Sequence, residues 1–180
     1  MDDHTEGSAV LLMDLQEDFL DETGRMPVDR LGAQAVIDTA NAILSGKALP
    51  GTSPVLVVNQ FPASARVGNL LRHGAAIVGS DGSRLDRRLV NHETARVFAK
   101  RRASAFSNPE LLAHLRMHGV KRLFVLGVFA EGCVRATVLD AVREGFMTCV
   151  ISDAIATNAQ WKKRLALWSM KRAGAILLSL

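Results

Sequence analysis

The sequence predicts a three-layer αβα domain, in which helices cover both faces of a six-stranded, mainly parallel sheet with strand order 3-2-1-4-5-6. Short apolar runs alternate along the chain with stretches whose apolar residues recur at helical spacing, which is typical of βαβ units. Right-handed crossovers in such units place the first strand in the middle of the sheet. The 180 residues are 48% hydrophobic and 22% charged, an ordinary globular composition that suffices for one core.

The expected strands are short runs rich in β-branched and other apolar residues. They occupy 9–13, 55–58, 95–99, 123–128, 148–151 and 176–178. Between them, helices are expected over about 30–44, 109–118, 133–144 and 160–173. The second of these begins at a clear signal, with Asn108 as the N-cap and Pro109 in the first turn. Residues 61–89 are rich in glycine and serine and form a long, partly irregular connection, which in a compact domain is often functional.

Several classes of protein are disfavoured by composition. Residues 1–8 are expected to form a flexible N-terminal tail before a single domain at 9–180; the tail is polar, unlike a signal peptide. No apolar run is long enough to span a membrane. The formal charge of +4 is spread along the chain, which favours a solvated surface over a nucleic-acid interface. We therefore expect a cytoplasmic protein with a small-molecule substrate and no membrane or nucleic-acid partner.

The number and spacing of the cysteines favour a reactive thiol over a framework of disulfide bonds. The chain has two cysteines and no CxxC motif, which argues against a disulfide framework and against a zinc knuckle. Cys133 is expected in the first turn of a helix, just past the carboxyl end of a strand, where backbone N–H groups and the helix dipole favour thiolate. Cys133 is thus a candidate nucleophile, although a lone cysteine at such a place is more often a small buried residue. Cys149 lies within an apolar strand and is expected to pack in the core.

Two further residues are expected near Cys133. Asp14 ends the first predicted strand, and Lys100 ends the third. In the predicted order the first and fourth strands are neighbours, so Asp14 and Cys133 face one crevice at the carboxyl edge of the sheet. Lys100 can reach that crevice from the end of the third strand.

Three motifs, in this order and at this spacing, resemble those of the isochorismatase-like cysteine hydrolases. That family includes isochorismatases, nicotinamidases, N-carbamoylsarcosine amidases and maleamate amidases. The resemblance covers about residues 10–178, and the run from Gly132 to Thr137 is most similar to the last two groups. The motifs are Asp14-Leu-Gln-Glu-Asp-Phe19, Lys100-Arg-Arg-Ala-Ser-Ala-Phe106 and Gly127-Val-Phe-Ala-Glu-Gly-Cys-Val134.

The resemblance implies a catalytic triad of Asp14, Lys100 and Cys133. Cysteine would attack an amide carbonyl, aspartate would act first as base and then as acid, and lysine would stabilise charge on both. By the same analogy, the backbone N–H groups of Phe129 and Cys133 would form the oxyanion hole, and the Val128–Phe129 peptide bond would be cis.

The resemblance also leaves the substrate open. Metal-using nicotinamidases carry an Asp-x-His pair after the second strand, whereas Asn59-Gln-Phe-Pro62 offers no ligand cluster, so we expect neither a metal nor another cofactor. In the amidases an arginine near 154–161 grips a substrate carboxylate, and no arginine occupies that stretch here. The expected reaction is C–N hydrolysis of a small amide or carbamoyl compound through a thioester. Candidate substrate-binding residues are Gln16, Phe19, Gln60, Phe61 and Phe106, although the phenylalanines can equally be core and Gln16 a turn cap.

Three alternatives stay open at this point. The chain can be an isochorismatase-type vinyl-ether hydrolase, or a non-catalytic family member that binds a metabolite or a protein partner. A redox-sensing thiol is a weaker option, because no resolving cysteine is near. The resemblance also implies a homodimer or homotetramer. The last helix offers an apolar contact for such an assembly, although burial against the sheet explains the same residues, which are Trp161, Leu165, Trp168 and Met170.

Overall fold

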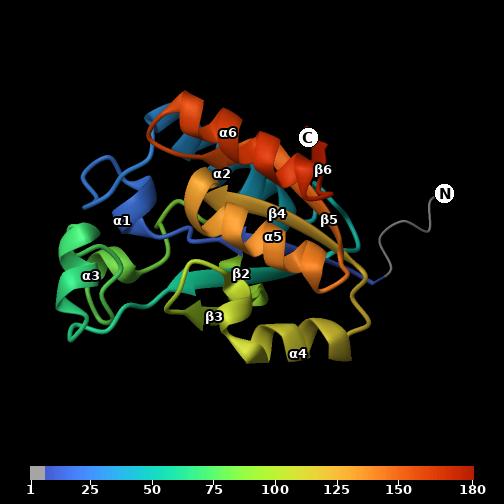
Figure 1. Cartoon of the computed structure of the whole chain (residues 1–180), viewed down its shortest axis with the longest axis horizontal. Coiled ribbons are helices and arrows are strands. Elements are labelled where there is room, and N and C mark those ends of the chain that lie inside the picture. Colours follow the sequence, from blue (N-terminus) through green and yellow to red (C-terminus); the bar gives the residue numbers. More distant parts are fainter. Residues whose placement is uncertain (1–6) are drawn as a thin grey trace.

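The computed structural model describes residues 7–180 and has one six-stranded sheet in the order β3-β2-β1-β4-β5-β6 (Figure 1). All five neighbouring strand pairs are parallel, so the predicted fold class and strand order are confirmed. The strands are β1 (Ser8–Met13), β2 (Ser53–Asn59), β3 (Arg96–Lys100), β4 (Arg122–Val128), β5 (Met147–Ala156) and β6 (Ile176–Leu178).

The helices cover both faces of this sheet. Helices α1 and α2 pack on one face, while α4, α5 and α6 pack on the other, so the molecule has the predicted three layers (Figure 1). Helix α3 belongs to the connection between β2 and β3. The helices are α1 (Glu17–Leu20), α2 (Arg30–Leu44), α3 (Arg66–Leu71), α4 (Pro109–Met117), α5 (Arg135–Arg143) and α6 (Gln160–Arg172), and the shorter turns are η1 (Asp81–Ser83), η2 (His92–Thr94), η3 (Ala105–Ser107) and η4 (Ala130–Val134).

The central strand β1 supplies side chains to both halves of the core. Val10 and Leu12 face the layer of α1 and α2, whereas Leu11 and Met13 face the layer of α4, α5 and α6. This alternation follows from the two-residue repeat of a strand. Because both faces are covered, every residue of β1 is buried, and all of them after Ser8 are apolar.

Several element boundaries follow directly from local chemistry. Helix α2 has the bounds predicted from its apolar spacing, and Asp29 caps it by accepting a hydrogen bond from the Gly32 N–H. Helix α4 is capped as predicted, since the Asn108 side chain accepts from the Glu110 N–H at 3.0 Å. Strand β5, predicted to end at about 151, continues to Ala156 because its pairing with β4 resumes after a register shift.

The structure corrects the position of Cys133 relative to the helix. Residues Ala130–Val134 form the wide turn η4, in which Gly132 has the non-helical angles φ −100° and ψ −107°. The regular helix α5 begins only at Arg135. Cys133 therefore lies before the helix rather than in its first turn, and the helix-end argument for a thiolate loses its basis.

The N-terminal boundary also differs from the prediction. Ser8 pairs with Arg122 and is the first, buried residue of β1, although it was assigned to the flexible tail at 1–8. Residues 1–6 of that tail lie outside the described residues. Within residues 7–180, no helix is both long and apolar enough to cross a membrane.

The long connection 61–89 is partly irregular, as predicted, but it is anchored at several points. Phe61 pairs with Ile77, and Gln16 pairs with Leu85, each through an isolated bridge. The buried carboxylate of Asp18 in α1 accepts a hydrogen bond from the Ala76 N–H at 2.8 Å. Both α1 and α3 consequently lie at the end of the molecule toward which β2 points (Figure 1).

Candidate active site

Four polar residues meet where parallel strands end. Asp14 follows β1, Asn59 ends β2, Lys100 ends β3, and Cys133 lies in the turn after β4. Asn59 and Lys100 are direct partners in the register of β2 and β3. The carboxyl edge of a parallel sheet is the usual ligand site in open α/β folds. We call Asp14, Asn59, Lys100 and Cys133 the catalytic floor.

Asp14 owes its orientation to an unusual backbone conformation. Its φ is +57°, in the left-handed region that aspartate tolerates better than most residues, and its N–H donates to the Val57 carbonyl at 2.8 Å. The neighbouring Gly127 has φ +122°, and a Cβ atom there would collide with the backbone of Met13. Only glycine therefore lets β4 pass this close to the residue preceding Asp14.

The Lys100 ammonium is the centre of the catalytic floor. Its Nζ lies 3.0 Å from Asp14 Oδ2, 2.6 Å from Asn59 Oδ1 and 3.1 Å from Cys133 Sγ. These three partners match the three N–H donors of an ammonium group. The side chains of Lys100 and Asp14 are 0% and 1% exposed. The structure thus brings the three residues of the predicted triad into contact in a dry site.

Asn59 is a member of this floor that the sequence did not identify. Besides accepting from Lys100, its Nδ2 lies 3.8 Å from Cys133 Sγ. The side chain of Gln16 holds the Asn59 backbone from both sides, accepting from its N–H at 2.8 Å and donating to its carbonyl at 2.9 Å. The only available signal for Asn59 was its place at the end of a predicted strand.

Gln16 itself is not placed as a substrate-binding residue. The side chain also donates to the Ser83 carbonyl at 2.7 Å, and the residue is 0% exposed. With its amide bonded to backbone on both sides, Gln16 faces protein rather than a ligand. The prediction that Gln16 binds substrate failed because a side-chain amide can bond backbone groups as well as it can bond a ligand.

Burial governs the charges of the floor. It raises the pKa of Asp14, and the nearby Lys100 ammonium offsets this effect only in part. For Lys100, burial is the largest single influence and acts to lower the pKa, but the attraction and hydrogen bonds of Asp14 and Cys133 together outweigh it, and the pKa is raised. Burial, assisted by the negative Asp14, raises the pKa of the Cys133 thiol from 9.0 to about 12, against the opposing influence of Lys100.

These directions correct the expectation that Cys133 rests as a thiolate. The raised pKa favours a neutral thiol at Cys133 in the free protein at neutral pH. The expectation relied on the positive end of a helix, whereas Cys133 precedes that helix and lies beside a carboxylate. The proton must accordingly leave the sulfur during the reaction rather than before it.

The backbone around Cys133 has the predicted cis bond between Val128 and Phe129. The Phe129 carbonyl accepts hydrogen bonds from the N–H groups of Gly132 and Val134, at 3.0 and 3.2 Å, which closes the turn around the thiol. The assignment of the Phe129 and Cys133 N–H groups to an oxyanion hole stays a prediction.

A cavity of ≈ 270 Å³ opens over Cys133. Phe19 and Phe61, two of the predicted substrate-binding residues, line it together with Phe129. The rings of Phe19 and Phe129 meet edge to face with centroids 5.5 Å apart. The remaining lining residues are Met26, Asn59, Arg72, Glu131, Gly132, Asn158 and Lys162.

Two predicted substrate-binding residues lie away from this cavity. Gln60 is exposed and lines a separate hollow beside Arg101 and Arg102. Phe106 stacks on Phe146, with ring centroids 5.9 Å apart. Sequence position alone placed both near a motif, but the first turns outward and the second packs against the α5 side of the core.

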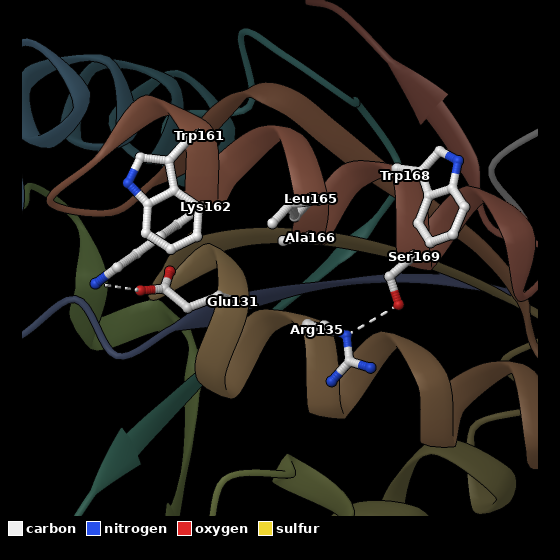
Figure 2. A pocket seen from close by; sticks show the side chains of 8 residues that line it. All are labelled: Glu131, Arg135, Trp161, Lys162, Leu165, Ala166, Trp168 and Ser169. Atoms are coloured by element: carbon white, nitrogen blue, oxygen red, sulfur yellow. Dashed lines mark hydrogen bonds and ion pairs between the residues drawn. The ribbon is translucent and has the colours of Figure 1, made fainter.

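Three charged residues also line the cavity, and none of them was predicted from the sequence. We call Arg72, Glu131 and Lys162 the charged rim. Lys162 Nζ lies 3.4 Å from Glu131 Oε1 and donates to Asn158 Oδ1 at 2.9 Å (Figure 2). Arg72 lies over the ring of Phe61, with its guanidinium carbon 3.7 Å from the ring centroid.

A second hollow of ≈ 460 Å³, which shares Glu131 and Lys162 with the first cavity, lies between α6 and the beginning of α5 (Figure 2). Trp161, Leu165 and Trp168 border it and are more than half exposed, whereas Met170 is fully buried in the core. The apolar face proposed for subunit contact therefore lacks Met170. The homodimer or homotetramer itself stays a prediction.

The described residues hold no cluster suited to a metal ion. Across 7–180, no group of three or more His, Cys, Asp or Glu side chains is arranged to bind one.

Known proteins resemble the chain, some of them over nearly its whole length. A family model described as the isochorismatase domain matches residues 8–180. A probable inactive nicotinamidase of Arabidopsis thaliana is 28% identical over 177 residues, covering 93% of this chain and 89% of that protein. The N-carbamoylsarcosine amidase of an Arthrobacter species is 35% identical over 83 residues, covering 44% of this chain and 31% of that enzyme. The crystal structure of PnC1 from L. infantum with nicotinate has a TM-score of 0.85 at 25% identity, covering 97% and 93% of the two chains.

Proposed function

This chain belongs to the isochorismatase family and is a hydrolase, and we propose that it cleaves a C–N bond of a small amide or carbamoyl compound through a thioester on Cys133. The observation that carries this proposal is the position of Lys100, whose Nζ lies 3.1 Å from Cys133 Sγ and 3.0 Å from Asp14 Oδ2. A nucleophile, a base and a positive charge thus share one dry site beneath a small cavity.

The first half of the reaction forms the thioester. As Cys133 Sγ attacks the substrate carbonyl, the thiol proton moves to the Asp14 carboxylate, and an oxyanion forms on the carbonyl oxygen. The N–H groups of Phe129 and Cys133 are the proposed donors to that oxyanion. Asp14 then returns the proton to the leaving nitrogen, so that ammonia or an amine departs and the acyl group remains on sulfur.

The second half regenerates the thiol. Water attacks the thioester while Asp14 accepts one of its protons, and the carbon–sulfur bond breaks to release the acid. The proton then returns to sulfur. Lys100 stays charged throughout, because its raised pKa keeps the ammonium protonated, and it offsets the negative charge that moves between Asp14 and Cys133.

The raised pKa of Asp14 suits this double role. A carboxyl group whose pKa lies closer to neutrality holds a proton long enough to deliver it to the leaving nitrogen. The neutral resting thiol of Cys133 is also compatible with it, because proton transfer and attack occur together. The same arrangement without Asp14 would leave the leaving group unprotonated.

The test is ammonia release from a panel of small amides and carbamoyl compounds, with acid-quenched samples analysed by mass spectrometry for an acyl group on Cys133. We expect Cys133→Ala to lower turnover by about 10⁴-fold or more, as removal of a nucleophile does elsewhere. Cys149→Ala is the matched control, since Cys149 is buried in β5 away from the cavity. Turnover that survives in Cys133→Ala would refute the covalent route.

A further inference from the structure

We infer that the cavity over Cys133 selects substrates that carry a carboxylate, and that Arg72 binds this group. The inference builds on the proposed function for the reaction itself, but it depends on a different part of the cavity. It concerns the charged rim rather than the catalytic floor.

The Arg72 guanidinium is short of partners. Its Nε is buried and has no hydrogen-bond partner among the described residues. The one hydrogen bond recorded for this side chain runs from Nη2 to Asn69 Oδ1 at 3.0 Å. A guanidinium carries five N–H donors in a planar fork that matches the two oxygens of a carboxylate. A buried donor without a partner is costly, so a ligand that supplies acceptors here gains affinity.

Arg72 is held in place before any ligand arrives. The guanidinium is stacked on Phe61, and Asn69, which accepts from it, donates in turn to the Pro62 carbonyl at 3.0 Å. Gly68 leaves the space for it, because a Cβ atom at that position would come within 2.9 Å of Arg72 Nη2. Such a preorganised donor loses little conformational freedom on binding.

The charges around the cavity favour an anion as well. Among the residues that line it, Arg72 and Lys162 are positive and Glu131 is negative. Glu131 already pairs with Lys162 at 3.4 Å, and the described residues show no ion pair for Arg72. In the floor below, Asp14 and Lys100 balance each other at 3.0 Å. The positive charge of Arg72 is therefore the one left for a ligand to neutralise.

The cavity sets the size of that ligand. Its volume of ≈ 270 Å³ lies at the lower end of the range of about 300–1,000 Å³ that is usual for ligand pockets, which favours a compact substrate. With Cys133 and Arg72 lining the same cavity, the fitting compound has an amide or carbamoyl group at one end and a carboxylate at the other. Short monoamides of dicarboxylic acids and N-carbamoyl amino acids have this form.

The experiment compares acids with neutral isosteres. The probes are oxamate, malonamate, succinamate and glutaramate, each paired with its diamide, in which an amide replaces the carboxylate at the same size. Calorimetry on Cys133→Ala protein measures affinity without turnover, and ammonia release on the unmodified chain measures kcat/KM. We expect at least one acid to bind about 10-fold or more tightly than its diamide. Arg72→Gln should abolish this preference, and Arg72→Lys should restore part of it.

Arg66→Gln is the matched control, because Arg66 begins helix α3, which Arg72 directly follows, and Arg66 is exposed and does not line the cavity. The Arg66→Gln variant should keep the preference for the acid. Thermal unfolding should show that Arg72→Gln and Arg66→Gln are both folded. Equal binding of every acid and its diamide, binding of none, or an unchanged preference in Arg72→Gln would overturn the inference.

The outcomes also separate this inference from the proposed function. Cys133-dependent hydrolysis of diamides with no preference for acids would leave the proposed reaction standing and remove the role of Arg72. Arg72-dependent binding of an acid with no hydrolysis of any amide would support the role of Arg72 and contradict the proposed reaction.

Discussion

Members of the catalytic floor and of the charged rim line the same cavity, yet the two groups are built by different means. In the floor, side chains at or just past the ends of neighbouring strands surround the buried Lys100, which contacts all three other members. In the rim, Arg72, Glu131 and Lys162 come from connections and from α6 and are half-buried, and of the three only Glu131 and Lys162 pair with each other. This difference indicates that the topology of the sheet positions the reactive side chains, whereas the connections around the cavity determine which ligands can bind.

Among changes to the floor that keep the Cys133 nucleophile, the largest effect is expected for Asp14→Asn. Loss of the base should lower kcat/KM by about 10³-fold, within the range of general acid–base catalysis. The same change should raise thiol reactivity, because the negative Asp14 contributes to the high pKa of Cys133 while Lys100 remains to lower it. Iodoacetamide labelling of Cys133 between pH 7 and 9, followed by mass spectrometry, should therefore be slow in the unmodified chain and faster in Asp14→Asn.

A variant that labels more slowly than the unmodified chain would contradict the assigned electrostatics. Lys100→Met provides the opposite control, since removal of the positive neighbour should raise the pKa of Cys133 further and slow labelling.

A smaller effect on catalysis is expected for Gln16, whose side chain holds the floor residue Asn59 in place. Gln16→Leu removes the side chain that bonds both the N–H and the carbonyl of Asn59. We expect the free energy of unfolding to fall by about 2 kcal/mol, because buried backbone groups lose their partners. Urea unfolding measures this loss. Catalysis should fall mainly through kcat, with KM nearly unchanged, since Gln16 positions Asn59 and faces no substrate; a selective rise in KM would show that it contacts the ligand.

The smallest effect is expected at the rim, for Lys162→Met. Its ion pair with Glu131 joins side chains that are 31% and 35% exposed, and solvent screens such pairs strongly. The free energy of unfolding should change by less than about 1 kcal/mol. Thermal and urea unfolding would test this value. A fall in the free energy of unfolding as large as that expected for Gln16→Leu would contradict the view that the rim contributes less to stability than the floor.

The same division explains what could be predicted from the sequence. Asp14, Lys100 and Cys133 were predictable because each follows an apolar run, and the crossover rule brings the ends of such runs together. Arg72 was not, because the connection 61–89 shows no periodicity from which a side-chain direction follows. The protonation of Cys133 was predicted wrongly, since it depends on burial and on the proximity of Asp14, which are properties of the folded chain.

The substrate-binding residues divide in a similar way. Phe19 and Phe61 line the cavity because they follow strand ends closely, by five residues after Asp14 and two after Asn59. Gln60 and Phe106 are equally close to motifs but turn elsewhere. Proximity along the chain therefore selects candidates, and only the local backbone direction decides among them.

Gly127 carries a consequence for how genetic data on this chain are interpreted. In a saturation mutagenesis library, positions that accept no replacement are commonly assigned to chemistry. Gly127 would score among the least tolerant, because any side chain there strikes the Met13 backbone, although glycine has no group that reacts. Sensitivity to replacement at this codon would report the spacing of two strands, and a reader of such a map would need to separate it from the intolerance of Cys133.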